Sequence, residues 1–325
     1  MSELKSIPIL VSKKMNVDTL ATLRETFDVR PFDGNPASLG DEDRHAVRGI
    51  ALAGGAGAAL MDALPNLEII ASFGVGYDGV DVAAAAARRV LVTNTPDVLT
   101  EEVADTTLGL LLNTVREFSK AERYLRDGRW ETDGPYPLTP MTLRGRSAGI
   151  FGLGRIGLAI ARRLEAFGLT VSYHNRRQRD DVPYPYHASL ADLAAAVDTL
   201  IVAAPGGPAT ENAVGPAVLE ALGPNGVLIN IGRGTTVDEA ALVKALASGT
   251  IGAAGLDVFV NEPKVSADLR ALDNVVLLPH LGSASRATRW AMGDVVVNNL
   301  KMWFQERRVV TPVPEIVAAG LVEAG

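Results

Sequence analysis

Short apolar runs recur along the chain, separated by longer stretches in which apolar residues have helical spacing. The runs predict strands at Pro8–Val11, Gly49–Ala53, Glu68–Ser72, Val90–Thr93, Ser147–Phe151, Thr170–Tyr173, Thr199–Ala203, Val227–Asn230, Ala254–Val258 and Val275–Leu278. Strands that are almost continuously Val, Ile, Leu or Ala are typical of parallel sheets covered on both faces. The alternation of such strands with helices predicts repeated βαβ units and an α/β fold.

A longer helix is predicted between the two groups of strands. It begins after Thr100, a suitable N-cap followed by two acidic residues, and is expected to continue to about Asp127. The irregular segment Trp130–Met141 follows, and a last helix is expected over Ser285–Arg307. A chain of 325 residues corresponds to about two domains at a typical size of roughly 150 residues each.

Composition narrows the functional classes. The chain has no cysteine, which excludes disulfides, zinc–cysteine sites, iron–sulfur clusters and thiol nucleophiles. Its net charge of −7 argues against a nucleic-acid-binding protein, although a local basic pocket for a small anion is compatible with it. No uninterrupted apolar stretch of about 18 residues and no signal-peptide core near Met1 is evident, so we expect a cytoplasmic protein without a membrane segment.

A glycine-rich turn is the first sign of chemistry. Gly152, Gly154 and Gly157 form the pattern GxGxxG between the predicted strand Ser147–Phe151 and a predicted helix over Leu158–Phe167. Here the first glycine permits a tight turn, the second lets the backbone approach a pyrophosphate, and the third allows close helix–strand packing. The helix N-terminus then offers N–H groups to phosphate oxygens. The motif therefore predicts a dinucleotide site rather than an ordinary tight turn.

The end of the next predicted strand indicates which dinucleotide binds. A site for NAD normally carries Asp or Glu there to bind the ribose 2′-hydroxyl, but this chain has Asn175 followed by Arg176 and Arg177. Two guanidinium groups could hold a 2′-phosphate that a carboxylate would repel. We therefore expect NADP, with NADPH preferred over NADH. The alternative is that both arginines belong to a solvated surface cluster.

Three more segments place polar residues at predicted strand ends, where open α/β sheets bind their ligands. Imidazole titrates near neutral pH, so His280 is a natural proton donor to a carbonyl oxygen. A carboxylate at Glu262 would favour the imidazolium and orient it. The planar fork of Arg233 suits a substrate carboxylate and a polarised carbonyl. The segments are Leu228–Gly234, Gly255–Pro263 and Val276–Ser283.

The order of GLGRIG, NIGRG, GLDVFVNEP and LLPHLGS closely resembles that of the D-isomer-specific 2-hydroxyacid dehydrogenases, over essentially the whole chain. With Asn175-Arg176-Arg177, it is most similar to the glyoxylate/hydroxypyruvate reductases that use NADPH. The resemblance implies reduction of small 2-keto acids to glycolate or D-glycerate by hydride transfer, without a metal. It implies catalytic roles for Arg233, Glu262 and His280.

The resemblance also implies the binding residues. Asp257 is expected to contact the nicotinamide carboxamide, with a structural N-cap as the alternative. Separately, Arg289 and Trp290 follow His280 by less than three helical turns, so we expect one of them to shape the substrate end of the site; the alternative is surface or hinge packing. The remaining expected cofactor contacts are Thr106, Gly152, Gly154, Arg155, Ile156, Gly157, Asn175, Arg176, Arg177, Ala204, Pro205, Thr210, Ile231, Gly232, Arg233, His280, Gly282 and Ser283, and the remaining expected substrate contacts are Gly54, Val75, Gly76, Arg233 and His280.

The resemblance further implies two doubly wound parallel-sheet domains with the active site in the cleft. A flavodoxin-like substrate domain would comprise residues 1–99 and 288–325, and a Rossmann domain for NADP residues 100–287. Residues from about 100 to 146 resemble the family's dimerisation arm, so we expect a homodimer.

Two other kinds of function stay open. One is a different D-2-hydroxyacid dehydrogenase, acting on pyruvate or phenylpyruvate, or on a phosphoglycerate. The other is a dinucleotide-sensing, corepressor-like binding protein. The joint presence of Arg233, Glu262 and His280 favours an enzyme that turns substrate over.

Overall fold

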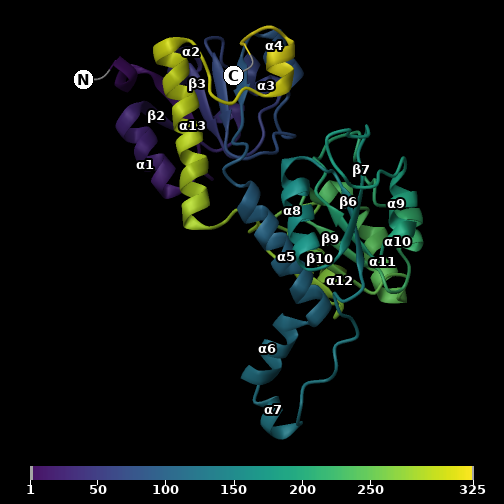
Figure 1. Ribbon diagram of the computed structural model, residues 1–325. Coiled ribbons are helices and arrows are strands. Elements are labelled where there is room, and N and C mark those ends of the chain that lie inside the picture. Colours follow the sequence, from purple (N-terminus) through teal and green to yellow (C-terminus); the bar gives the residue numbers. More distant parts are fainter. Residues whose placement is uncertain (1–2, 324–325) are drawn as a thin grey trace. The chain divides into compact units, whose positions relative to one another are not determined.

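The computed structural model describes residues 3–323, which form two compact units (Figure 1). The first unit contains the residues up to Leu99 and those from Ser285 onward, and the second unit is Thr100–Ala284. Each unit is built on one parallel sheet with helices on both of its faces. Among residues 3–323, no helix combines the length and apolar character needed to cross a membrane.

The first unit contains a five-stranded sheet within the described residues. Its strand order is β2 (Asp28–Phe32), β1 (Pro8–Ser12), β3 (Gly49–Leu52), β4 (Ile69–Ser72) and β5 (Leu91–Thr93), all parallel. Its helices are α1 (Val17–Thr26), α2 (Asp41–Ala46), α3 (Ala58–Asp62), α4 (Val82–Ala87), α13 (Arg286–Glu306) and α14 (Pro314–Ala318), with 3-10 turns at Glu3–Ser6 and Pro36–Ser38. The sequence pattern missed β2, because Arg30 and Pro31 interrupt it. As an edge strand, β2 tolerates a proline.

The second unit contains a six-stranded sheet within the described residues. Its order is β11 (Val275–Leu277), β10 (Ala253–Leu256), β9 (Val227–Asn230), β8 (Thr199–Val202), β6 (Ser147–Phe151) and β7 (Thr170–His174), all parallel. Its helices are α5 (Thr100–Arg116), α6 (Phe118–Arg126), α7 (Arg129–Thr132), α8 (Arg155–Ala166), α9 (Leu190–Ala196), α10 (Pro216–Leu222), α11 (Glu239–Ser248) and α12 (Ala267–Arg270), with a 3-10 turn at Gly234–Thr236.

Both sheets are doubly wound, which confirms the predicted fold class. In the second unit the chain runs from β6 to β7 on one side and then crosses to β8 on the other side of β6. The direction of winding therefore reverses between β6 and β8. A switch point of this kind is where open parallel sheets place their ligands, at the carboxyl ends of the strands.

The predicted single helix from Glu101 to about Asp127 is two helices in the structure. Glu117, between α5 and α6, has φ of 53° in the left-handed region. The side chain of Asn113 stabilises this break, because its Oδ1 accepts the N–H of Ser119 at 2.9 Å and its Nδ2 donates to the Ser119 hydroxyl at 2.7 Å. A side-chain bond of this type competes with the regular helical pattern.

Helix α5 packs closely on the second sheet and on α8. A Cβ atom at Gly255, in β10, would lie 2.5 Å from the hydroxyl of Thr114 and 2.8 Å from Cγ of Leu110, both on α5. On its other side, Arg163 of α8 forms ion pairs with Glu101 and Asp105 at 2.7 and 2.6 Å. The absence of a side chain at Gly255 is therefore what lets the helix lie against the strand.

Helix α13 belongs to the core of the first unit, although it is far in sequence from the strands of that unit. Leu300 is fully buried, and a Cβ at Gly49 would lie 3.2 Å from it. Gly293 faces Thr19 of α1 so closely that a Cβ there would be 2.0 Å from the Thr19 hydroxyl. The sheet β1–β5 is therefore covered on this face only when α13 is in place.

Candidate active site

The glycine-rich turn follows β6 directly at the switch point. Gly152 has φ of +99°, and a Cβ there would lie 2.5 Å from the backbone nitrogen of Ala204. A Cβ at Gly157 would lie 2.3 Å from the carbonyl oxygen of Gly152, whereas nothing lies within 4 Å of the Cβ position of Gly154, the N-cap of α8. The first and third glycines are therefore required for packing, and the second leaves open space at the helix N-terminus. This cradle fits the pyrophosphate of a dinucleotide.

The segment after β7 lies against this turn. The carbonyl of His174 accepts the N–H of Gly152 at 3.0 Å, and Oδ1 of Asn175 accepts the N–H of Leu153 at 2.7 Å. Arg176 and Arg177 are exposed. The structure therefore gives Asn175 a bond to the turn itself, and it leaves the two arginines accessible to a ligand.

The remaining predicted cofactor contacts around residues 204–232 line the neighbouring strand ends. Ala204 and Pro205 follow β8, and a Cβ at Gly232, after β9, would lie 2.5 Å from the carbonyl oxygen of Ala204. The hydroxyl of Thr210 donates to the carbonyl of Pro205 at 2.6 Å and so closes the loop between them. Ile231 is buried. The main chain of this loop is thus brought close to the glycine-rich turn.

Asp257 is buried at the end of β10 and binds the main chain near His280. Its two carboxylate oxygens accept the N–H groups of Leu281 and Gly282 at 2.7 and 2.8 Å. Burial raises the pKa of Asp257, and these two hydrogen bonds oppose the shift. On the other side of the loop, Thr106 donates its hydroxyl to the carbonyl of Gly282 at 3.2 Å. Asp257 therefore has a structural role in holding the loop 281–283, which includes Ser283.

His280 and Glu262 form a hydrogen-bonded pair at the carboxyl ends of neighbouring strands. Nδ1 of His280 lies 2.7 Å from one carboxylate oxygen of Glu262, and the other carboxylate oxygen accepts the N–H of Phe259 at 3.0 Å. Burial opposes ionisation of Glu262, but the bonds from His280 and Phe259 outweigh it and hold its pKa below the usual value. His280 has φ of 53°, a backbone strain that is often found at functional sites.

Arg233 lies in the turn after β9 and adds positive charge near Glu262, where it helps to lower the pKa of that carboxyl. A residue that sequence reasoning missed fixes this turn. The buried Asn230 donates to the carbonyl of Arg233 at 2.9 Å and accepts the N–H of Gly232 at 3.0 Å. A Cβ at Gly234 would lie 1.9 Å from the carbonyl carbon of Phe259, so the turn packs directly on the segment that leads to Glu262.

The predicted substrate residues of the first unit lie at its own carboxyl edge. Gly54 follows β3, has φ of +139° and is exposed. Val75 and Gly76 follow β4, the neighbouring strand, and the Nδ2 of Asn94 donates to the carbonyl of Val75 at 2.9 Å. Because a trans peptide directs its N–H opposite to its C=O, this bond orients the N–H of Gly76. Asn94 is a second residue that the sequence pattern did not indicate.

Arg289 and Trp290 occupy different positions on α13. The guanidinium of Arg289 lies 5.7 Å from the ring centre of Phe73, in the loop that contains Val75. The indole N–H of Trp290 instead donates to Asp18 of α1 at 2.6 Å. The structure therefore associates Arg289 with the loop after β4, whereas Trp290 is exposed and links α13 to α1 through this bond. Within the described range, no cluster of three or more His, Asp or Glu side chains is arranged to hold a metal ion.

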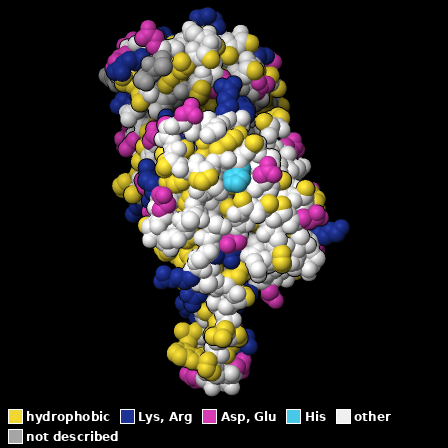
Figure 2. All heavy atoms as spheres, turned by 45° about the vertical axis from the view of Figure 1, so that its right-hand side comes forward, with side chains coloured by type: hydrophobic (Ala, Val, Ile, Leu, Met, Phe, Trp, Pro, Cys, Tyr) yellow, Lys and Arg dark blue, Asp and Glu magenta, His cyan; other side chains and the backbone are white. Residues whose placement is uncertain are grey.

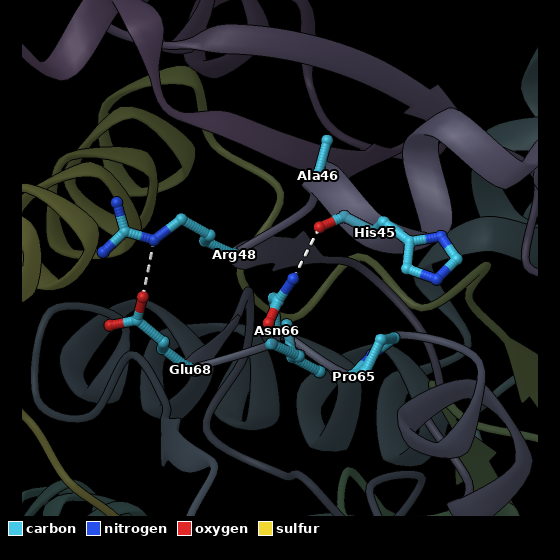
Figure 3. A pocket seen from close by; sticks show the side chains of 7 residues that line it. His45, Ala46, Arg48, Pro65, Asn66 and Glu68 are labelled. Atoms are coloured by element: carbon cyan, nitrogen blue, oxygen red, sulfur yellow. Dashed lines mark hydrogen bonds and ion pairs between the residues drawn. The ribbon is translucent and has the colours of Figure 1, made fainter.

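A separate hollow of about 430 Å³ lies in the first unit, beside the amino ends of β3 and β4 (Figure 3). In it Arg48 and Glu68 form an ion pair at 2.6 Å, and Asn66 donates to the carbonyl of His45 at 2.7 Å. None of the predicted site residues lines this hollow. Since parallel sheets bind ligands at the opposite, carboxyl edge, we regard it as a surface feature apart from the site.

Comparison with known proteins identifies the family. Residues 108–282 match the model of the D-isomer specific 2-hydroxyacid dehydrogenase NAD-binding domain. A glyoxylate/hydroxypyruvate reductase A from Arabidopsis thaliana is 44% identical over 95% of this chain and all of the relative. The chain belongs to the D-isomer-specific 2-hydroxyacid dehydrogenase family. The predicted family and its oxidoreductase class are thereby confirmed.

Other relatives of this dehydrogenase differ in the substrates that their names give. A hydroxyphenylpyruvate reductase from Plectranthus scutellarioides is 49% identical over 80% of this chain and 82% of the relative. Among solved structures, an NADPH-dependent glyoxylate/hydroxypyruvate reductase from Sinorhizobium meliloti, in complex with NADP and malonate, is 57% identical. It covers 95% of this chain and 97% of its own, with a TM-score of 0.93.

Proposed function

We propose that this dehydrogenase uses NADPH to reduce small 2-keto acids, glyoxylate and hydroxypyruvate, to the corresponding 2-hydroxy acids. The observation that carries the proposal is the His280–Glu262 pair, with a bond of 2.7 Å, in the same unit as the glycine-rich turn. The names of the Arabidopsis and Sinorhizobium relatives support the choice of substrates.

Different residues of this chain would bind the substrate, orient the imidazole and donate the proton. A bound nicotinamide dinucleotide supplies the hydride. His280 gives a proton to the carbonyl oxygen from Nε2, because its Nδ1 faces Glu262. Glu262 stabilises the imidazolium and fixes its orientation. Arg233 binds the substrate carboxylate and polarises the neighbouring carbonyl.

The preference for NADPH rests on the residues after β7. Arg176 and Arg177 are exposed, and the adjacent position 175 carries an uncharged Asn. At positions 175–177, directly after the strand, a 2′-phosphate would meet positive charge and no carboxylate. The Sinorhizobium relative, which its name describes as NADPH-dependent, supports the same preference.

A panel of 2-keto acids with NADPH and NADH tests this function. We expect turnover of glyoxylate and hydroxypyruvate with NADPH, and the panel includes 4-hydroxyphenylpyruvate because of the Plectranthus relative.

Arg233→Ala should lower kcat/KM by at least about 100-fold, since the substrate carboxylate loses a charge-assisted pair. An unchanged kcat/KM in this variant would refute the role of Arg233, and a preference for NADH would refute that of the arginines.

We also propose that the protein acts as a cytoplasmic homodimer, joined through the arm formed by α6, α7 and the segment up to residue 146. Four large apolar side chains of this arm are exposed by half or more, namely Phe118, Leu125, Trp130 and Leu138. Figure 2 displays hydrophobic side chains gathered at the lower end of the view, where the arm lies. Apolar patches of this kind mark contact surfaces.

A further inference from the structure

The loop that follows β7 contains a side chain that the proposed function does not use. Arg179 donates from Nη1 to the carbonyl oxygen of Leu153 at 2.8 Å. Leu153 is the residue between the first two glycines of the turn, and it is almost fully buried. Asn175 accepts the N–H of the same residue. The two peptide groups of Leu153 are therefore held from the same loop, one by each side chain.

Arg179 is itself held firmly in this position. The hydroxyl of the buried Tyr173 accepts the N–H of Arg179 at 2.8 Å and donates to its carbonyl at 3.3 Å. Asp181 binds the guanidinium with two hydrogen bonds, at 2.9 and 2.5 Å. The guanidinium nitrogen that remains is the one that reaches Leu153. Each of the three guanidinium nitrogens therefore makes one hydrogen bond, and a planar group held in this way is well suited to positioning a backbone.

We infer that Asn175 and Arg179 are positioning residues that fix the Leu153 peptides, so that the phosphate-binding turn stays shaped for the pyrophosphate of either coenzyme. This inference rests on the proposed dinucleotide function. The residues of the loop after β7 then have two different roles. Arg176 and Arg177 recognise the 2′-phosphate that only NADPH carries, whereas Asn175 and Arg179 act on the part that NADPH and NADH share.

The chemistry of position 175 provides a matched set of variants. Asn175→Asp keeps an oxygen that can accept the Leu153 N–H but adds a negative charge, whereas Asn175→Leu has similar size and no acceptor. Arg179→Met removes the donor to Leu153 and retains the length of the side chain. Arg177→Ala is the control for recognition of the 2′-phosphate.

The experiment measures the Kd of NADPH and of NADH for the full chain, without keto acid, from the fluorescence of the nicotinamide. Arg179→Met and Asn175→Leu should each raise both Kd values roughly tenfold, as expected for one lost hydrogen bond to a preorganised site, and leave their ratio within about twofold. Asn175→Asp and Arg177→Ala should raise the Kd of NADPH alone. With saturating NADPH, kcat of Arg179→Met should stay within about twofold of wild type, because the turn affects binding rather than proton transfer.

Two outcomes would overturn the inference. If Arg179→Met weakens NADPH alone, Arg179 is a ligand of the 2′-phosphate. If it weakens neither coenzyme, the contact with Leu153 has no role in binding. Asp181→Asn, an exposed change that loosens Arg179, should weaken both coenzymes by a smaller factor and tests the inference should Arg179→Met fail to fold. A wild-type protein that prefers NADH would refute the proposed NADPH preference, yet an equal loss of both coenzymes in Arg179→Met would still support positioning.

Discussion

At the scale of single residues, the carboxylate of Glu262 is held by hydrogen bonds to two neighbours. One oxygen binds His280 and the other binds the N–H of Phe259, so neither can rotate away without losing a bond. The pKa of Glu262 lies below its ordinary value although burial acts in the opposite direction. The carboxylate is therefore charged throughout the neutral range and loses this charge as the pH falls through its lowered pKa.

Glu262→Gln tests what this charge contributes. The variant retains a hydrogen-bonding side chain of the same shape but favours an imidazolium less than a carboxylate does. We expect kcat/KM for glyoxylate to fall by about 100-fold or more at neutral pH, within the usual range for general acid catalysis. The acid limb that Glu262 contributes, by gaining a proton as the pH falls through its lowered pKa, should be lost from the pH–rate profile, while the Kd of NADPH stays unchanged.

A neighbouring carboxylate provides the control for this variant. The side chain of Glu239, in α11, accepts the N–H of Val260 at 3.5 Å, whereas His280 is bonded to Glu262. Glu239→Gln should leave the pH–rate profile of the wild type unaltered. If Glu262→Gln keeps the acid limb of the wild type, then another group causes that limb, and the charge of Glu262 is not what the reaction requires.

Which residues can be predicted from the sequence depends on how local their contacts are. The glycines of the turn are recognisable because their spacing follows from a strand, a turn and a helix in immediate succession. Arg233, Glu262 and His280 are recognisable because each lies in a short motif at a strand end. Asn94 and Arg179 make their contacts with backbone groups in other segments, and no local pattern indicates them. Asn230 lies inside the NIGRG motif, but the motif alone does not reveal that its side chain fixes the turn.

At the scale of helices and strands, the contact between α5 and β10 depends on glycine. Gly255→Ala should lower the free energy of unfolding by about 1–3 kcal/mol, because its Cβ would overlap Thr114 and Leu110 in a packed interface. Denaturation by urea, followed by circular dichroism, measures the change.

For a glycine within α5 itself, we expect the opposite effect of an alanine substitution on the free energy of unfolding. Gly109 is exposed on α5, and nothing lies within 4 Å of its Cβ position. Gly109→Ala should therefore raise the free energy of unfolding by about 0.5–1 kcal/mol, since alanine loses less backbone entropy in a helix. Equal effects of both substitutions would mean that the interface relaxes freely, and the close contact would then be unimportant for stability.

The boundaries of elements were harder to predict than their existence. The strands of the second unit lie close to their predicted ranges, because buried parallel strands produce unbroken apolar runs. The break at Glu117 was not predicted, because it depends on the side-chain bonds from Asn113 to Ser119 rather than on proline or glycine. The edge strand β2 was not predicted, because an edge position relaxes the need for an apolar pattern.

At the scale of the whole molecule, the exposed apolar side chains of the arm lead to a prediction about assembly. Leu125→Asp combined with Trp130→Asp should convert the proposed dimer into a monomer, because two charges would enter an apolar contact. Light scattering coupled to size-exclusion chromatography measures the mass. Asp127→Asn, on the same arm, is a surface control that should leave the mass unchanged. A wild-type monomer would refute the proposed role of the arm.

The way α13 completes the first unit has a consequence for the order of folding during synthesis. The second unit is one uninterrupted segment, so all its strands have been translated before Arg286–Glu306 exists. After β5 has been translated, more than half of the chain must still be made before α13 is complete and can cover the sheet β1–β5. This takes roughly 10–40 s at about 5–20 residues per second. Throughout that interval its apolar face is uncovered, which makes the earliest part of the nascent chain the part most dependent on chaperones.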